Sequence, residues 1–345
     1  RSLVALQRGD TGIAIDSLSA LLPSLPGTGL QPEVLAMLGG ALVQDGRHAE
    51  AATHLSELLL AFPDYPGRRE AQELLGDTYL ALGDATRAAE LFAVLSTSDP
   101  DNDVTGSLRR RLATARQQQG NAAAALAIYD RLLVEGSGEA DALQLARGRL
   151  LATLGRVQDA IDAFDQVRGS SLLPAARLGS ANLHFASGRF ERASAAYAPL
   201  LAGEISIEIM GRAVVSLYEL GRRDEADKMA KQQLKRFGKD GVWPYLFRLY
   251  QGRYWLQQRQ HDKARKIFES VTKDAADQPA HVDMGPGVPV AMRRMAADPV
   301  SAGAFLAVTS QWEQMRADPT EEGTTSALQA QANFARKYPD SPFAA

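Results

Sequence analysis

The side chains that most often carry out catalysis or bind metals are few in this sequence and are not grouped. The histidines form no pair four residues apart with a glutamate between them, which is the spacing of a helical zinc site; they are His48, His54, His184, His261 and His281. Cysteine is absent, which excludes disulfides, thiolate metal sites and cysteine nucleophiles. The Gly-Pro-Gly run at 285–287 lacks the lysine and the serine or threonine of a phosphate-binding loop. We therefore expect no enzyme activity, no cofactor and no metal site.

A basic and aromatic segment is the next candidate for chemistry. Residues 222–273 hold 14 lysines or arginines against 6 acidic residues, an excess of eight positive charges. Its rings crowd into thirteen positions: Trp243, Tyr245, Phe247, Tyr250, Tyr254 and Trp255. Basic charge between aromatic rings can stack sugars or bases and bind anionic groups, so Trp243, Tyr245 and Trp255 form an alternative ligand surface for an anionic polysaccharide. Core packing is the competing interpretation, because most of these rings fall at helical spacing.

Pairs of helices must position these residues, because the sequence repeats with the period of a helix pair. A glycine recurs where the first helix of each pair should end, with an arginine in the eighth place: Gly9, Gly46, Gly83, Gly120, Gly155, Gly188, Gly221 and Arg259. The spacings between these anchors lie between 33 and 38 residues. Aromatic residues make up only 7% of the chain, whereas alanine is abundant, which favours close-packed helices over sheet.

Each anchor is followed by a fixed pattern of apolar residues, which predicts the packing seam of the pairs. Five residues after the anchors stand Ala14, Ala51, Ala88, Ala125, Ala160, Ala193, Ala226 and Ala264. One turn later come Leu18, Leu55, Phe92, Tyr129, Phe164, Tyr197, Ala230 and Phe268. Seven residues before the anchors stand Ser2, Gly39, Gly76, Ala113, Gly148, Ala181, Val214 and Gly252. Small residues at a helix crossing let the backbones approach, and the large residues fill the space between neighbours.

This pattern resembles the tetratricopeptide repeat, in which a small residue stands in the first helix, an alanine and an aromatic residue in the second, and a proline after it. Pro26, Pro63 and Pro100 stand where that proline belongs. The resemblance covers residues 1–276 and implies an all-α fold, a right-handed superhelical solenoid of about eight antiparallel helix pairs.

In this family the first helix of each pair lines a concave groove that holds peptides. The groove-facing turns of this chain are expected to present Glu33, Glu70, Glu73, Asp77, Arg110, Thr114, Gln117, Arg149, Asn182, Phe185, Tyr218 and Arg253. Arg110, Arg149 and Arg253 could bind acidic side chains or a terminal carboxylate through two hydrogen bonds each. The alternative is that these residues are ordinary solvated helix faces. A chaperone-type carboxylate clamp is disfavoured, because Asn182 pairs with Leu178 rather than with a lysine.

The C-terminal part departs from the period. Residues 277–299 contain four prolines and two glycines and predict an inserted loop or hinge. Residues 300–317 and 324–338 predict a divergent ninth helix pair within residues 300–345, with Phe305, Trp312 and Met315 on the first helix and Leu328, Phe334 and Ala335 on the second. Both ends of the chain look cut rather than capped, so we expect a piece of a longer protein.

Taken together, these features predict a non-catalytic scaffold that binds a protein or peptide partner. The net charge of -3 gives no reason to expect nucleic acid, and no apolar run is long enough to span a membrane. The runs FPDYP at 62–66 and YPDSPF at 338–343 look like those of bacterial envelope tetratricopeptide proteins, so we expect a periplasmic or outer-membrane-associated protein, with the cytoplasm as the alternative. A polysaccharide-export subunit, or a regulatory domain of a larger enzyme or transcription activator, remains open.

Overall fold

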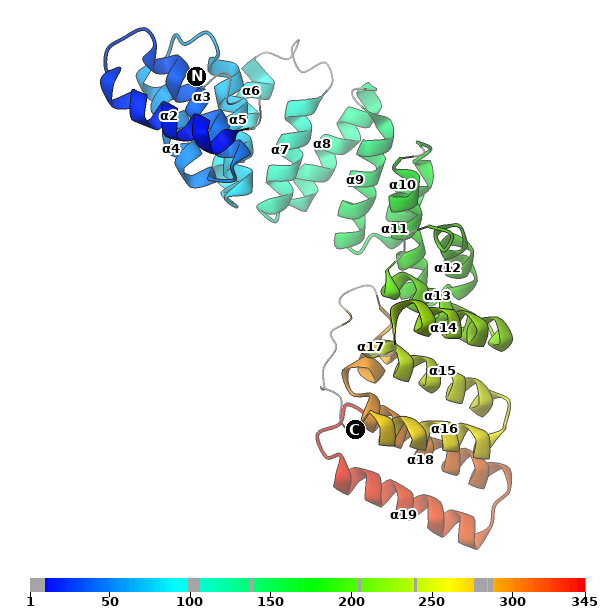
Figure 1. Cartoon of the computed structure of the whole chain (residues 1–345). Coiled ribbons are helices and arrows are strands. Elements are labelled where there is room, and N and C mark those ends of the chain that lie inside the picture. Colours follow the sequence, from blue (N-terminus) through cyan, green and yellow to red (C-terminus); the bar gives the residue numbers. More distant parts are fainter. Residues whose placement is uncertain are drawn as a thin grey trace. The chain divides into compact units, whose positions relative to one another are not determined.

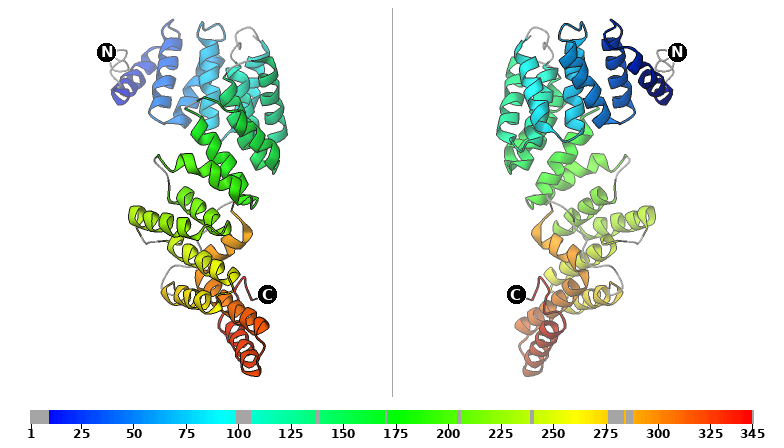
Figure 2. Two further views of the ribbon diagram at one scale, coloured as in Figure 1. Left: turned by 90° about the vertical axis from the view of Figure 1, so that its right-hand side faces the viewer. Right: turned by 90° about the vertical axis from the view of Figure 1, so that its left-hand side faces the viewer.

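The described residues of the chain are α-helical, and no strand occurs among them. The computed structural model describes residues 10–98, 106–136, 139–169, 171–203, 206–238, 241–275, 284 and 288–344. They group into two compact units, Arg1–Val167 and Arg168–Ala345. Within each unit, successive helices pack against one another, as Figures 1 and 2 show. This confirms the predicted all-α class with sequential helix pairs.

The described residues of the first unit form four complete helix pairs. A single described helix, α2 (Thr11–Leu21), precedes them and continues into the short 3-10 helix η1 (Leu22–Ser24). The pairs are α3 (Gln31–Gln44) with α4 (His48–Ala61), α5 (Arg68–Ala81) with α6 (Ala85–Ser98), α7 (Ser107–Gln118) with α8 (Ala122–Glu135), and α9 (Ala140–Thr153) with α10 (Val157–Gln166).

The second unit contains three further pairs, a short helix and a last pair. The three pairs are α11 (Leu173–Ala186) with α12 (Phe190–Tyr197) and the 3-10 helix η3 (Ala198–Leu200), α13 (Ile207–Glu219) with α14 (Arg223–Phe237), and α15 (Trp243–Gln257) with α16 (His261–Asp274). The short helix is α17 (Val290–Ala297), and the last pair is α18 (Pro299–Ala317) with α19 (Glu321–Lys337).

The turn inside each repeat pair from α3 to α16 uses the predicted anchor residue in a left-handed conformation. Six anchor glycines have φ between 68° and 78°, and they are Gly46, Gly83, Gly120, Gly155, Gly188 and Gly221. Arg259 occupies the same conformation at φ 57° and is the sole residue other than glycine with positive φ in the described chain. In its turn the N–H of Gln260 donates to the Trp255 carbonyl at 2.9 Å, as Asn121 does to Arg116 at 2.9 Å. Gly9 lies outside the described residues.

The predicted seam is the core of the pairs. All eight alanines are 0% exposed, and the residues one turn later are at most 6% exposed. The small residues of the first helices lie against those large side chains: a Cβ added to Gly39 would lie 2.6 Å from Leu55 Cδ2, and one added to Gly76 would lie 2.6 Å from Phe92 Cζ. In these two pairs, a side chain in place of the glycine would collide with the large residue opposite, so the glycines set the close spacing of the helices.

The prediction of a loop or hinge over residues 277–299 is wrong for its last part. Residues 290–297 form α17, which buries Met292, Met295 and Ala296 in the core of the second unit. Proline does not prevent this, because Pro289 precedes the first turn and Pro299 opens the next helix at a position that needs no backbone donor. The residues 277–283 and 285–287, with His281, lie outside the described residues, as do Ser2 and Pro100.

The last pair is built differently from the others. Phe305 of α18 contacts Phe334 of α19 and Phe343 beyond it, with ring centroids 5.9 and 5.3 Å apart. On α19, Ala327 and Phe334 are buried, whereas Leu328 is 54% exposed and Ala335 is also exposed. Of Leu328, Phe334 and Ala335, only Phe334 is therefore buried, since α19 turns another face to α18.

Candidate partner-binding surface

An arginine of α7 bridges two carboxylates of α5 on the surface that the first helices form in the first unit. Arg111 Nη1 lies 3.0 Å from Glu73 Oε2, and its Nε lies 3.6 Å from Asp77 Oδ1. Arg69 Nε adds a contact of 3.2 Å to Glu73. Burial raises the pKa of Asp77, against the attraction of Arg111 and with a further rise from Glu73. Glu73 and Asp77, expected to face a ligand, are thus compensated within the chain.

Two more carboxylates lie near the beginnings of α3 and α5. Glu33 and Glu70 are both exposed, and both act on Tyr65. Burial raises the pKa of the Tyr65 phenol, and the charges of Glu33 and Glu70 raise it further. Of the four acidic residues expected on this surface, Glu33 and Glu70 are therefore the two that water solvates.

Arg110 of α7 stands beside two hydroxyl groups. Burial raises the pKa of the Tyr129 phenol, and this rise is opposed by a hydrogen bond with Thr114 and by the charge of Arg110. Arg110 is partly buried, and no carboxylate of the described chain forms an ion pair with it. Gln117, one turn beyond Thr114, is exposed. The Thr114 hydroxyl donates to the Arg110 carbonyl at 3.1 Å, so the Arg110 guanidinium is the group here that offers hydrogen-bond donors to an anion.

Arg149 and Arg253 stand at the same repeat position, six residues before their anchors, yet only one of them has a partner. Arg253 Nη1 lies 3.2 Å from Glu219 Oε1, and its guanidinium lies 5.1 Å from the centre of the Tyr250 ring. The residue equivalent to Glu219 in the pair before Arg149 is Gln118, which carries no charge. Arg149 is exposed and forms no ion pair in the part of the chain that the structure describes.

Three of the predicted site residues serve the interior of the second unit. Phe185 is 0% exposed and Tyr218 is 4% exposed, so the expectation that they face a ligand is wrong. The Tyr218 hydroxyl donates to Asp227 Oδ1 at 2.6 Å. Asn182 Oδ1 accepts hydrogen bonds from Arg212 at 2.7 Å and from the Tyr197 hydroxyl at 2.8 Å. Phe185 and Tyr218 stand three residues before their anchors, on the side of the helix that meets the neighbouring helix.

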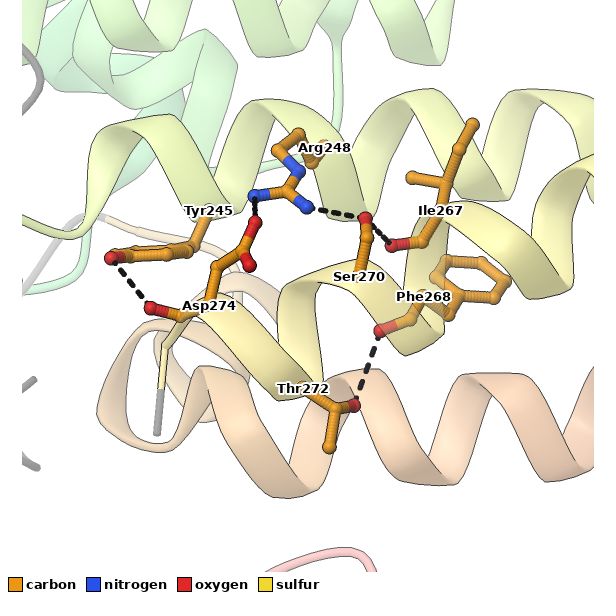
Figure 3. Close-up of polar contacts among 7 residues, drawn as sticks. All are labelled: Tyr245, Arg248, Ile267, Phe268, Ser270, Thr272 and Asp274. Atoms are coloured by element: carbon orange, nitrogen blue, oxygen red, sulfur yellow. Dashed lines mark hydrogen bonds and ion pairs between the residues drawn. The ribbon is translucent and has the colours of Figure 1, made fainter. Parts of the chain in front are cut away.

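The alternative ligand surface is divided by the structure. Trp243 is 5% exposed and packs on Phe247, with ring centroids 5.9 Å apart, so it belongs to the core. Figure 3 shows how Tyr245 and Arg248 of α15 hold the end of α16: the Tyr245 hydroxyl donates to the Asp274 carbonyl at 3.3 Å, and Arg248 Nη1 lies 2.9 Å from Asp274 Oδ2. Tyr245 therefore has a structural contact of its own.

Trp255 is the one member of that surface that keeps a partly exposed ring with cations around it. Arg223 of α14 lies 5.0 Å from the ring centre, and Lys263 Nζ of α16 lies 4.5 Å from it. Arg223 is itself paired with Asp227 at 3.2 Å. The ring already makes cation–π contacts within the chain, which leaves less of it available for a sugar.

Sequence reasoning missed the cross-helix arginines. Arg111 and Arg212 stand nine residues before their anchors and each reaches back to the preceding first helix. The anchor register contains this signal, because the same position carries arginine in both pairs. Among the described residues, no cluster of metal-binding side chains is found, and no helix there has the length and apolarity to cross a membrane.

Comparison with known families gives matches over most of the chain. A family model described as "Tetratricopeptide repeat" matches residues 1–66, 36–103, 110–174 and 212–279. No curated protein is similar to the sequence.

Solved structures of repeat proteins share the fold. The C-terminal part of a TPR repeat-containing protein from Cytophaga hutchinsonii is 13% identical, with a TM-score of 0.53 over 78% of this chain and 96% of that chain. A tetratricopeptide repeat protein from Parabacteroides merdae is 17% identical, with a TM-score of 0.48 over 72% of this chain and 95% of that chain. At these identities, the first likeness supports the fold alone.

Proposed function

Because the chain belongs to the tetratricopeptide repeat family, whose repeats form protein-interaction scaffolds, we propose that its first unit binds an acidic segment of a partner protein. The binding residues in this proposal are Arg110 on α7 and Arg149 on α9, with Thr114 and Gln117 as neighbouring polar contacts. The proposed role is to hold the partner and involves no catalysis.

The observation that carries the proposal is the difference between Arg149 and Arg253. A guanidinium offers a planar set of donors that matches a carboxylate with two hydrogen bonds. The guanidinium of Arg253 is already paired with Glu219. The equivalent position near Arg149 holds the uncharged Gln118, so the guanidinium of Arg149 can bind a carboxylate of a partner. Arg110 is also free, and its partial burial strengthens any ion pair it forms, because less water screens the charges.

The compensated carboxylates nearby favour the same choice of partner. Glu73 and Asp77 are held by Arg111, so they do not compete for Arg110 or repel an incoming acid at full strength. The charges at the two proposed positions, Arg110 and Arg149, are therefore positive and not paired within the described chain. An acidic segment is attracted there, and a basic one is repelled.

The test compares three forms of the chain in crosslinking capture from the source cells. We expect the wild type to capture a specific protein, and the variant Arg110→Gln/Arg149→Gln to lose it. Arg253→Gln is the matched control, because it removes an arginine at the same repeat position that is already paired. Identification of the captured protein, followed by substitution of its acidic residues, checks the chemistry. Equal capture by wild type and the double variant would show that the partner binds elsewhere.

A second candidate, contact with an anionic polysaccharide, is supported by Trp255 and Lys263 alone. Trp255 keeps a partly exposed ring, and Lys263 forms no ion pair among the described residues. Under this proposal, Trp255→Ala/Lys263→Ala weakens retention on an immobilised anionic polysaccharide. Unchanged retention would exclude that function.

We also propose that the protein works in a bacterial envelope. The support is the pair of runs at 62–66 and 338–343 together with the absence of cysteine. Fractionation of the source cells tests this, and recovery of the protein in the cytoplasmic fraction alone would contradict it.

A further inference from the structure

Helices α16, α18 and α19 of the second unit line an open groove. The function proposed above does not involve this groove. It has a volume of about 520 Å³, within the usual range of ligand-binding clefts. Ala304, Ala307 and Val308 of α18 form its floor, and Ala330 and Phe334 of α19 form part of one wall. The other wall is α16, which, like α19, packs against α18 (Figure 1).

The groove follows from the way the last pair is packed. In four of the repeat pairs, a glycine of the first helix lies directly against a large side chain of the second, as Gly148 does with Phe164. In the last pair, Phe305 of α18 meets Phe334 of α19 instead. Two aromatic rings between the helices occupy more space than a glycine and one ring. Alanines then cover α18 between α16 and α19 and do not fill the hollow.

The rims of the groove carry cations on both sides. Lys273 stands on α16 and Lys337 on α19, and both are exposed. Neither forms an ion pair with a carboxylate of the described chain, although Lys337 lies 5.3 Å from the centre of the Tyr338 ring. Glu269 is the single acid among the lining residues. The lining therefore combines an apolar floor with one net positive charge.

These features select both the charge and the conformation of the occupant. The two lysines favour acidic residues on either side of the segment that fills the floor. An extended segment would place unpaired peptide groups over alanine and valine side chains, which is unfavourable, whereas a helix satisfies its own peptide groups. A helix also runs along the walls that α16 and α19 provide and presents apolar residues at i, i+3, i+4 and i+7 to the floor.

We propose that this groove binds an amphipathic helix of a partner protein, with small or medium apolar side chains on α18 and acidic side chains at Lys273 and Lys337. The site is independent of Arg110 and Arg149, which belong to the first unit. It gives the scaffold a second point of attachment.

The test uses the full chain and a fluorescein-labelled helical peptide with leucines at that spacing and glutamates on both flanks. A peptide with lysines in place of the glutamates is the control. We expect the glutamate peptide to bind at least about tenfold more tightly than the lysine peptide, and Lys273→Glu/Lys337→Glu to reverse the order. Lys266→Glu, on α16 outside the groove, should leave the preference unchanged. Arg110→Gln/Arg149→Gln should also bind the peptide normally, which separates this test from the first proposal.

Two further variants test the location of the peptide. Ala304→Leu fills the groove from its partly open floor, and we expect it to abolish binding without lowering the urea unfolding midpoint. Because the chain lacks cysteine, an environment-sensitive dye can be placed at Ala330→Cys inside the groove or at Ala332→Cys on the exposed side of α19. The first dye should respond to the peptide and the second should not. Equal binding of both peptides, a response at both dyes, or self-association of the chain that Ala304→Leu removes would overturn the proposal.

Discussion

The contact between the two helices differs between the repeat pairs and the last pair, α18 with α19. In the pair α5 with α6, Gly76 lets the backbone approach until Phe92 fills all the space between the helices. In the last pair, Phe305 and Phe334 hold the helices at the distance of two rings. In these two pairs, the small residue opposite a large one closes the surface, whereas the two rings of the last pair leave a groove beside them.

The largest expected effect separates the two kinds of core. Phe92→Ala should lower the free energy of unfolding by about 3–5 kcal/mol, because the ring is 0% exposed and its loss leaves a closed cavity. Phe334→Ala should cost about half as much, because this ring is 8% exposed and already lines an open groove. Urea unfolding gives the totals, and hydrogen exchange shows whether the loss stays near the substituted pair, as expected of a repeat protein.

Equal losses for the two phenylalanines would contradict the comparison. They would mean that Phe334 is as tightly enclosed as Phe92, and that the groove closes in solution. Phe62→Ala, which removes a partly exposed ring after α4, gives the baseline for losing an aromatic side chain outside the seam.

Adjacent glycines in α3 provide the next sharpest test of the seam. A Cβ at Gly39 would lie 2.6 Å from Leu55 Cδ2, and Leu55 is 0% exposed and has no free space to enter. Gly39→Ala should therefore lower the free energy of unfolding by about 1–3 kcal/mol. A Cβ at Gly40 would have no neighbour within 4 Å, so Gly40→Ala should raise it by about 0.5–1 kcal/mol through helix propensity.

Thermal and urea unfolding of the two single variants measure this difference directly. Since both changes are the same substitution in consecutive positions, effects on the unfolded chain are nearly matched. The same sign for both variants would show that the contact with Leu55 does not set the spacing of α3 and α4.

The repeat fold could be predicted from the sequence because one register determines each turn and each seam contact. Each structural requirement is local and selects one residue type at a fixed position. The turn requires a glycine with positive φ, the helix crossing requires an alanine, and the space one turn later requires a large side chain. The turn at Arg259 could be predicted although the residue is not glycine, because Ala264 and Phe268 stand at the expected distances after it.

The binding surface could be predicted only in part, since exposure depends on the partner helix and not on the register alone. Phe185 and Tyr218 stand on the first helices but face inward. Arg253 was expected to bind a carboxylate of a partner, but Glu219 of the preceding pair already pairs with it, and a contact between pairs is not visible within one repeat. The groove beside α19 left no repeat signal, because it arises where the repeat is lost.

A smaller effect is expected at Arg259, the one anchor residue that is not glycine. Arg259 holds φ 57°, a conformation that costs a residue with a Cβ about 1 kcal/mol. Arg259→Gly should therefore raise the free energy of unfolding by up to about 1 kcal/mol. The gain is reduced by the greater conformational entropy that glycine gives the unfolded chain. The reverse change, Gly155→Arg, should lower it by about 1 kcal/mol. A loss of stability in Arg259→Gly would show that the arginine side chain makes contacts that outweigh the strain.

The smallest expected effect concerns α19, where hydrophobicity alone would give the wrong answer. Leu328 is the more apolar of two neighbouring residues, yet it is 54% exposed, whereas Ala327 is 0% exposed against the rest of the second unit. Leu328→Gln should change the free energy of unfolding by less than about 0.5 kcal/mol, since this side chain is mostly exposed. Ala327→Gln, the matched control, should cost several times more, because a longer polar side chain must enter the interface with α18. Urea unfolding of both variants measures the two changes. A larger loss of unfolding free energy for Leu328→Gln than for Ala327→Gln would mean that the face of α19 that carries Leu328 is the packed one.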